Sequence, residues 1–258
     1  MRPSAPLYDA LAADYERHFA APHRRAYDEL AWEFCAAAIG PAPAIVVDVG
    51  CGVGRWASRL VAAGHRVVAI EPAPAMAARA RERLAGSAFT LVEAPVEDAV
   101  LPAGSADVVL AMGSLQYSTD PAAAIARCAG WVRPGGAVCV LLDSRQALVL
   151  ELLAAGRTDE ALERLATRRA VWQVGDHAAD LHLLDAAELS AAMRAAGLEI
   201  ERIAGLLVGA SAHGRANLLT RLERDYPAQL ATERRLATHP ALADLGKQLL
   251  AIARTPPF

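Results

Sequence analysis

The chain has 258 residues, of which 54% are hydrophobic and 21% charged, and its formal net charge is −3. This length and composition predict a single α/β domain with a substantial core and well-packed helices, and they exclude a disordered chain. The mildly negative charge, without any basic block, disfavours a nucleic-acid partner.

No apolar run in the sequence reaches the length that spans a membrane, and the N-terminal residues lack the apolar core of a signal peptide. We therefore expect a soluble, cytoplasmic protein. The sequence gives no support for an oligomer.

The cysteines have no metal-ligand spacing, so we expect reduced, buried thiols and no metal site at Cys35, Cys51, Cys128 and Cys139.

The first part of the chain has the pattern of two helices, over residues from about 7 to 39 and interrupted near Ala21-Pro22. Pro41 and Pro43 then precede a β-branched run, Ile45-Val46-Val47, of the kind expected in a strand buried on both faces. We therefore expect the core of the domain to begin at about residue 41.

The run ends at Asp48, and glycines follow at every second position, at Gly50, Gly52 and Gly54. Glycines of this kind let the backbone turn tightly and let a ligand approach where a Cβ atom would collide. A helical pattern comes next, and the amides in the first turn of such a helix favour a carboxylate or phosphate. The segment predicts a strand, a glycine turn and a helix that together bind an anionic group.

Gly64 closes that helix, and residues 67–70 form a second buried strand that ends at Glu71. An acidic residue roughly twenty positions after the glycines is typical of nucleotide-binding α/β units. Glu71 is placed to accept hydrogen bonds from the two hydroxyls of a ribose. The ligand indicated is thus a nucleoside with an anionic tail.

The spacing of the glycines decides the type of cofactor. A dinucleotide fingerprint places its third glycine at the position occupied by Arg55, so a nicotinamide-dependent oxidoreductase is disfavoured. Instead, Asp48-Val-Gly50-Cys-Gly52-Val-Gly54 resembles the first motif of the class I S-adenosylmethionine-dependent methyltransferases. The resemblance implies S-adenosylmethionine as cofactor and S-adenosylhomocysteine as product. It also implies a Rossmann-like sheet of seven mostly parallel strands with an antiparallel last strand, and helices on both faces.

The resemblance further implies a cofactor site at the carboxyl ends of the strands. In many members an aspartate occupies the place of Pro95, and this departure favours the main chain of Val96 and the side chain of Glu97 for the adenine. Met76 matches a position near the adenine, although a core methionine is an equal alternative. The residues expected to bind the cofactor are Asp48, Gly50, Cys51, Gly52, Gly54, Glu71, Pro72, Met76, Val96, Glu97 and Met112.

The N-terminal segment is similar to a helix that folds over the cofactor in many small-molecule methyltransferases, because Tyr8-Asp9 and Tyr15 form the pattern YDxxAxxY. In such enzymes an arginine or tyrosine of this segment often meets the methionine carboxylate. Arg24 and Arg25 are the candidates here, followed by Tyr15. A solvated helix face is the alternative for either arginine.

The next elements also follow the family pattern. Residues 89–92 and 108–111 read as the third and fourth strands, and Asp120-Pro121 opens a helix that continues to about residue 132. Arg133-Pro-Gly-Gly136 is expected to end that helix, before a fifth strand over residues 138–142. This helix–RPGG–strand run is characteristic of the methyltransferases.

Residues 143–184 are longer than a plain crossover and read as two helices followed by a loop that carries Trp172, His177 and His182. Segments of this length at this point commonly act as lids. A helix over 186–196, a strand over 198–203, further helices to 235 and a last strand over 248–253 complete the chain. We expect an N-terminal lid (1–40), a cofactor-binding core (41–144), a helical cap (145–185) and the remainder of the core (186–258).

The expected reaction is in-line transfer of the methyl group to a small molecule, such as an intermediate of secondary metabolism. A hydroxyl or protonated amine nucleophile needs a general base. His182 and His177 are the candidates because they lie in the expected lid and titrate near neutral pH, although a loop histidine often has no such role. Tyr117 is expected to contact the acceptor. The alternatives are a tRNA-nucleoside carboxyl methyltransferase and a non-methylating protein that binds S-adenosylmethionine.

Overall fold

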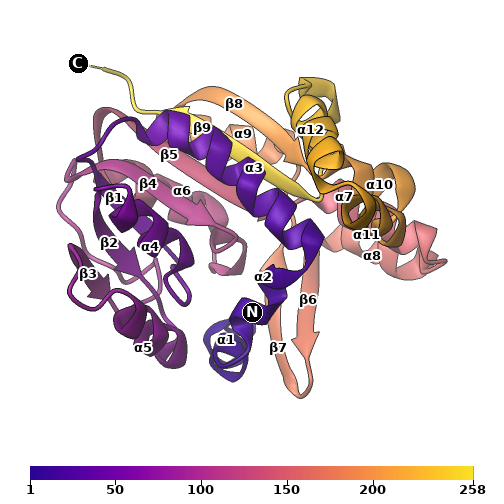
Figure 1. The fold of residues 1–258 in the computed structure, drawn as a ribbon, viewed down its shortest axis with the longest axis horizontal. Coiled ribbons are helices and arrows are strands. Elements are labelled where there is room, and N and C mark those ends of the chain that lie inside the picture. The colour runs from indigo at the N-terminus through magenta and orange to yellow at the C-terminus, as the bar shows by residue number, and fades with distance from the viewer. Residues whose placement is uncertain (258) are drawn as a thin grey trace.

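The computed structural model describes residues 1–257, and a seven-stranded sheet in the order β3-β2-β1-β4-β5-β9-β8 lies at its centre (Figure 1). The strand bounds are β1 (Ile45–Val49), β2 (Arg66–Ile70), β3 (Phe89–Val92), β4 (Ala106–Met112), β5 (Val132–Asp143), β8 (Glu199–Leu206) and β9 (Gln248–Arg254). The first five strands pair in parallel, whereas β9 is antiparallel to both β5 and β8. The predicted fold class is confirmed.

Both faces of the sheet are covered by helices because the strands are apolar on both sides. Val46 packs in a cluster with α3 (Pro22–Ile39) and α4 (Arg55–Ala62), whereas its neighbour Val47 packs with α6 (Pro121–Trp131) and α9 (Ala186–Ala195). Successive side chains of a strand point to opposite faces, which explains this division. The strand order reverses between β1 and β4, where open α/β sheets bind their ligands.

Two expected boundaries differ in the structure. The N-terminal segment forms three helices instead of two, namely α1 (Ala5–Leu11), α2 (Tyr15–Ala20) and α3. The additional break near Ala12 lets α1 pack on α5 (Pro74–Arg83) while α2 packs against α3. Arg133-Pro-Gly-Gly136 does not precede the fifth strand but lies inside β5, where Ala106 pairs with Val132 before a shift in register.

The segment between β5 and α9 contains the largest departure from expectation. Its helices, α7 (Arg145–Ala154) and α8 (Thr158–Thr167), are present as predicted. The expected loop around Trp172 is instead a β-hairpin of β6 (Arg169–Val174) and β7 (His177–His182), joined by Gly175 and Asp176. A glycine–aspartate pair between two strand-like runs favours such a two-residue turn.

Three further helices, α10 (Val208–His213), α11 (Arg215–Arg224) and α12 (Tyr226–Ala237), lie between β8 and β9, followed by the 3₁₀ turn η2 (Pro240–Leu245). In Figure 1 the hairpin lies beside α1 and α2, and α7, α8, α10 and α11 gather at one end of the molecule. These elements come from the beginning, middle and end of the chain. Together they enclose the carboxyl edge of the sheet.

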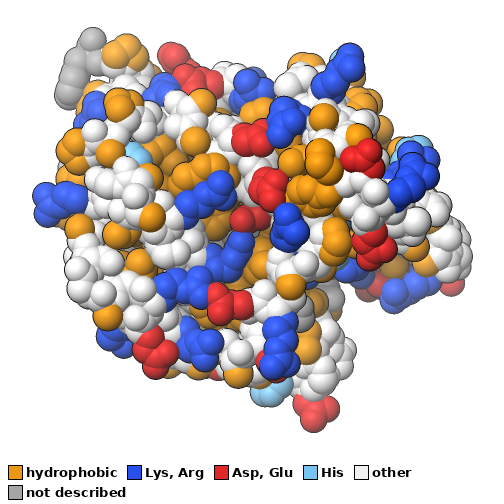
Figure 2. Space-filling model, viewed as in Figure 1, with side chains coloured by type: hydrophobic (Ala, Val, Ile, Leu, Met, Phe, Trp, Pro, Cys, Tyr) orange, Lys and Arg blue, Asp and Glu red, His pale blue; other side chains and the backbone are white. Residues whose placement is uncertain are grey.

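Polar contacts hold these elements in place. Arg145 pairs with Asp185 and with Glu188, at 2.8 Å, which joins α7 to α9. On the surface, Arg234 of α12 pairs with Glu33 of α3 at 2.7 Å, and Figure 2 shows basic and acidic side chains interspersed on this face.

Within the described residues, no helix combines the length and apolar character needed to cross a membrane. All four cysteines are buried and unpaired.

Candidate functional site

The glycine turn brings the end of β1 against the end of β2. Gly50 donates its amide to the carbonyl oxygen of Ile70 at 2.7 Å, and Cys51 donates to the same oxygen at 3.1 Å. The Glu71 carboxylate accepts hydrogen bonds from the main-chain amides of Gly52 at 2.8 Å and Ala73 at 2.9 Å. Glu71 is thereby fixed beside the turn, as expected for a residue that binds the ribose.

Asp48 and Glu71 are two buried carboxyls at this turn, with exposed fractions of 2% and 5%. Burial raises the pKa of each to about 7, and the charge of Glu71 adds to the rise in the pKa of Asp48. One oxygen of Asp48, Oδ2, is buried without a hydrogen-bond partner among the described residues. A polar cofactor with donor groups fits this pair of carboxyls.

A small cavity of about 110 Å³ lies next to Glu71. The carboxylate of Glu97 is held there by the amide of Thr119 at 2.8 Å. The structure thus brings Glu71, Pro72, Val96 and Glu97 together, at the place predicted for the nucleoside.

A larger cavity of about 920 Å³ adjoins the small one. This volume is within the range of small-molecule sites, which is about 300–1,000 Å³. The wall common to both cavities is made by residues of the lid, the glycine turn and the end of β4, namely Tyr8, Tyr15, Gly50, Gly52, Met112, Gly113 and Tyr117. Cys51 and Asp48 line the larger cavity only.

Aromatic side chains from four separate elements meet at this wall. The ring of Tyr8, on α1, lies 5.6 Å from that of Tyr117 and 5.5 Å from that of Trp172 on the hairpin, and both pairs are edge-to-face. The ring of Tyr15 lies 6.0 Å from that of Tyr8, and its Cε1 would be 3.8 Å from a Cβ atom added at Gly52. The lid therefore reaches the glycine turn through Tyr15.

The two arginines proposed for the methionine carboxylate separate in the structure. Arg24 lines the larger cavity, with its guanidinium 5.7 Å from the ring centre of Phe19. Arg25 lines neither cavity, because the turn of α3 directs it towards α12, where it stacks over Tyr226 at 4.7 Å. The cofactor assignment of Arg25 therefore has no geometric support.

The two histidines proposed as bases also lie outside both cavities. Side chains alternate along β7, so Leu181 points inward while His182 points away, with its Nε2 3.3 Å from the carbonyl oxygen of Thr119. His177 is exposed at the start of the same strand, beside the hairpin turn. The geometry therefore gives no support to their assignment as bases.

Two further residues assigned to the cofactor do not line either cavity. Met76 is fully buried between α1 and α5, among Leu7 and Leu11, which supports the core alternative. Gly54 has a positive φ of 77° and lies against α5, where an added Cβ atom would be 3.3 Å from Ala80. Both residues therefore support the site by packing and do not line it.

Several cavity residues were not anticipated. Arg55, at the start of α4, pairs with Asp28 at 2.7 Å and stacks over Phe19, and its neighbour Trp56 donates to Asp28 at 3.1 Å. Asp28 follows Arg24 by four residues, so helical spacing could have indicated that both face one side of α3.

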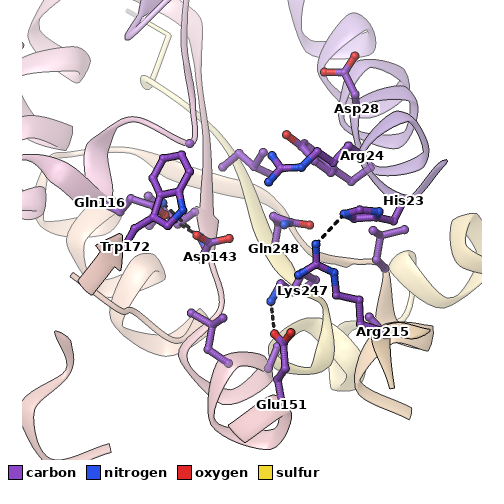
Figure 3. A pocket seen from close by; sticks show the side chains of 18 of the residues that line it. His23, Arg24, Asp28, Gln116, Asp143, Glu151, Trp172, Arg215, Lys247 and Gln248 are labelled. Carbon is purple, nitrogen blue, oxygen red and sulfur yellow. Dashed lines mark hydrogen bonds and ion pairs between the residues drawn. The ribbon is translucent and has the colours of Figure 1, made fainter. Parts of the chain in front are cut away.

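The end of β5 also contributes to the cavity, as Figure 3 shows. Gln116 is nearly buried, donates from Nε2 to the carboxylate of Asp143 at 3.1 Å, and accepts the Asp143 amide through Oε1 at 2.8 Å. Asp143 could have been predicted from the sequence as a site residue, because it lies at the carboxyl end of a parallel strand, where open α/β sheets bind their ligands.

This sheet order, with a glycine turn after β1 and an acidic residue after β2, defines a class I S-adenosylmethionine-dependent methyltransferase, and the chain belongs to that family. The family model described as a methyltransferase domain matches residues 47–140. The chain is 34% identical over 202 residues to a ubiquinone biosynthesis O-methyltransferase of Xanthomonas axonopodis pv. citri, covering 76% of this chain and 79% of that protein.

Solved structures show the same fold. A Haloferax volcanii methyltransferase in complex with the activator Trm112 aligns with a TM-score of 0.64 at 19% identity, over 99% of each chain. Phosphoethanolamine N-methyltransferase 2 of Haemonchus contortus, bound to S-adenosylmethionine, has a TM-score of 0.64 at 15% identity, over 96% of this chain and 57% of that one. The chain is thus an S-adenosylmethionine-dependent methyltransferase with a small-molecule acceptor, and the comparisons do not favour either alternative function.

Proposed function

We propose that the chain methylates a hydroxyl group of a small acceptor that binds in the 920 Å³ cavity, with Asp143 as the general base. The observation that carries the proposal is the pairing of Asp143 with Gln116 inside that cavity. The similarity to proteins named as O-methyltransferases also supports a hydroxyl acceptor.

The two hydrogen bonds between Gln116 and Asp143 fix both groups. The amide oxygen of Gln116 accepts the Asp143 amide, so its nitrogen must face the Asp143 carboxylate at Oδ2. Among the described residues no hydrogen bond is made to Oδ1, which can therefore accept one from an acceptor hydroxyl. A carboxylate held this way can take the proton as the oxygen becomes a nucleophile.

The remaining roles follow from the two cavities. Glu71 and Asp48 would bind the polar groups of the cofactor, and Arg24 its carboxylate. Bound S-adenosylmethionine supplies the methyl group, already attached to a good leaving group. Tyr8, Tyr117 and Trp172 would pack on the acceptor and exclude water, so the chain acts mainly by positioning the acceptor oxygen.

The proposal is tested by incubating the protein with labelled S-adenosylmethionine and a panel of catechols, simple phenols and matched anilines. We expect S-adenosylhomocysteine to accumulate with a hydroxyl acceptor and the label to be recovered as a methyl ether. Transfer to the anilines alone would contradict O-methylation. Retention of full turnover by Asp143→Asn would remove Asp143 as the base.

A further inference from the structure

The large cavity differs in character between its two ends. Asp143, Gln116 and Trp172 occupy one side of the view in Figure 3, whereas His23 and Arg215 occupy the other. Lys247 and Gln248 lie between them, and Gln248 is the register partner of Asp143. The cavity therefore gives an acceptor whose hydroxyl meets Asp143 room to extend past Gln248 towards Arg215.

The basic side chains of this region differ in how they are neutralised. Within the cavity lining, Lys247 pairs with Glu151, Arg55 with Asp28 and Arg164 with Glu160. Among the described residues, no carboxylate lies within 4.0 Å of the guanidinium of Arg24 or Arg215. If Arg24 binds the cofactor carboxylate, Arg215 is the cation left facing the acceptor.

His23 connects Arg215 to α3 without cancelling its charge. Nη2 of Arg215 lies 3.4 Å from Nε2 of His23. Burial, together with the positive charges of Arg215, Arg24 and Lys247, lowers the pKa of His23 to about 4. The imidazole is thus neutral at physiological pH and can accept a hydrogen bond from Arg215, which keeps the guanidinium at the cavity.

We propose that the acceptor is a hydroxylated carboxylic acid, whose carboxylate binds Arg215 while its hydroxyl faces Asp143. This inference rests on the proposed function of the same cavity. A planar guanidinium suits a carboxylate because the two groups can form two parallel hydrogen bonds. Arg215 would therefore select acceptors that carry a negative charge remote from the reacting hydroxyl oxygen.

The test uses calorimetric titration of protein saturated with S-adenosylhomocysteine. The probes are 3,4-dihydroxybenzoate, 3,4-dihydroxyphenylacetate and caffeate, each compared with its neutral amide. We expect at least one acid to bind wild-type protein tenfold or more tightly than its amide. Arg215→Gln should reduce that preference to less than twofold and leave the affinity for the amide unchanged.

Arg221→Gln is the matched control, since Arg221 lies on the same helix but not in the cavity, and it should keep the wild-type preference. The proposal is overturned by equal affinity for acids and amides, by a preference that survives Arg215→Gln, or by no binding of any acid. Wild-type affinity of Arg215→Gln for S-adenosylhomocysteine shows that the variant is folded. Methylation of a neutral phenol without any preference for acids would leave the proposed function intact and remove only this inference.

Discussion

The carboxylate of Asp9, on α1, accepts a hydrogen bond of 2.8 Å from the main-chain amide of Ala75, in the first turn of α5. The N-cap of α5 is Ala73, which has no side chain able to cap the helix. A residue of the N-terminal segment therefore caps a helix of the core. This contact places Tyr8 and Tyr15 of the same segment over the glycine turn.

Replacing Asp9 with alanine should loosen the N-terminal segment. Loss of a helix cap typically costs about 1 kcal/mol, so we expect a decrease of that order in the free energy of unfolding. Limited trypsin digestion should cleave more rapidly at Arg17, and affinity for S-adenosylhomocysteine should fall. Asp14→Ala is the control, because Asp14 is exposed and, among the described residues, forms an ion pair with Arg17 alone. Equal changes in unfolding free energy, cleavage rate and affinity in the two variants would contradict this role of Asp9.

Alanine substitutions at Gly52 and Gly54 should have different consequences. Gly52 faces both cavities, so Gly52→Ala should weaken binding of S-adenosylhomocysteine at least tenfold. Gly54 packs on Ala80 and Leu84, so Gly54→Ala should mainly lower stability, by about 1–3 kcal/mol. Denaturant unfolding and calorimetry on both variants test the contrast. A larger loss of affinity at Gly54 than at Gly52 would be inconsistent with the site as described.

The raised pKa values of Asp48 and Glu71 predict how stability depends on pH. Between the ordinary pKa of a carboxyl and about 7, the folded protein holds protons that the unfolded chain releases. Stability from these groups is therefore present at low pH and is lost as the pH rises to 7.

Asp48→Asn removes one of the two groups and should make the unfolding free energy less dependent on pH. From pH 5.5 to 8, the ligand-free variant should lose less stability than wild type, by on the order of 2 kcal/mol. Urea unfolding at both pH values measures the difference. Parallel losses in the two proteins would show that Asp48 does not titrate in this range.

The positions of the hairpin histidines and of Asp143 predict which substitutions affect turnover. His182→Ala and His177→Ala should retain turnover within about twofold, because neither residue lines either cavity. Asp143→Asn should lower turnover by about 10²-fold or more, as expected for loss of a general base. Initial rates at saturating acceptor compare the three variants. A tenfold loss in His182→Ala would return that histidine to the mechanism.

The central unit of the fold was predictable because its residues act locally. The β-branched run ending at Asp48, the glycines and Glu71 each fix a backbone conformation or a strand end, and the structure places them together. The number of strands in the main sheet and the antiparallel direction of the last one followed from the family resemblance.

The N-terminal helices and the β6–β7 hairpin were less predictable because their geometry depends on long-range packing. Leu181 and His182 are neighbours, and which of them faces the cavity depends on the register of the hairpin. The same holds for Arg24 and Arg25, since the rotation of α3 on the sheet decides which one reaches the site. Gln116 and Asp143 could have been recognised only by combining two strand ends that are far apart in the sequence.

The most direct test of the site is calorimetric titration with S-adenosylhomocysteine of wild type, Glu71→Ala and Glu97→Ala. Wild type should bind with micromolar affinity. Glu71→Ala should bind at least tenfold more weakly, a loss of about 1.4 kcal/mol, because it removes the carboxylate assigned to the ribose. Glu97→Ala should lose less, since the main chain of Val96, which lines the same small cavity, is also assigned to the adenine and is kept in this variant. Unchanged affinity in a folded Glu71→Ala variant would show that the cofactor does not bind at the glycine turn as described.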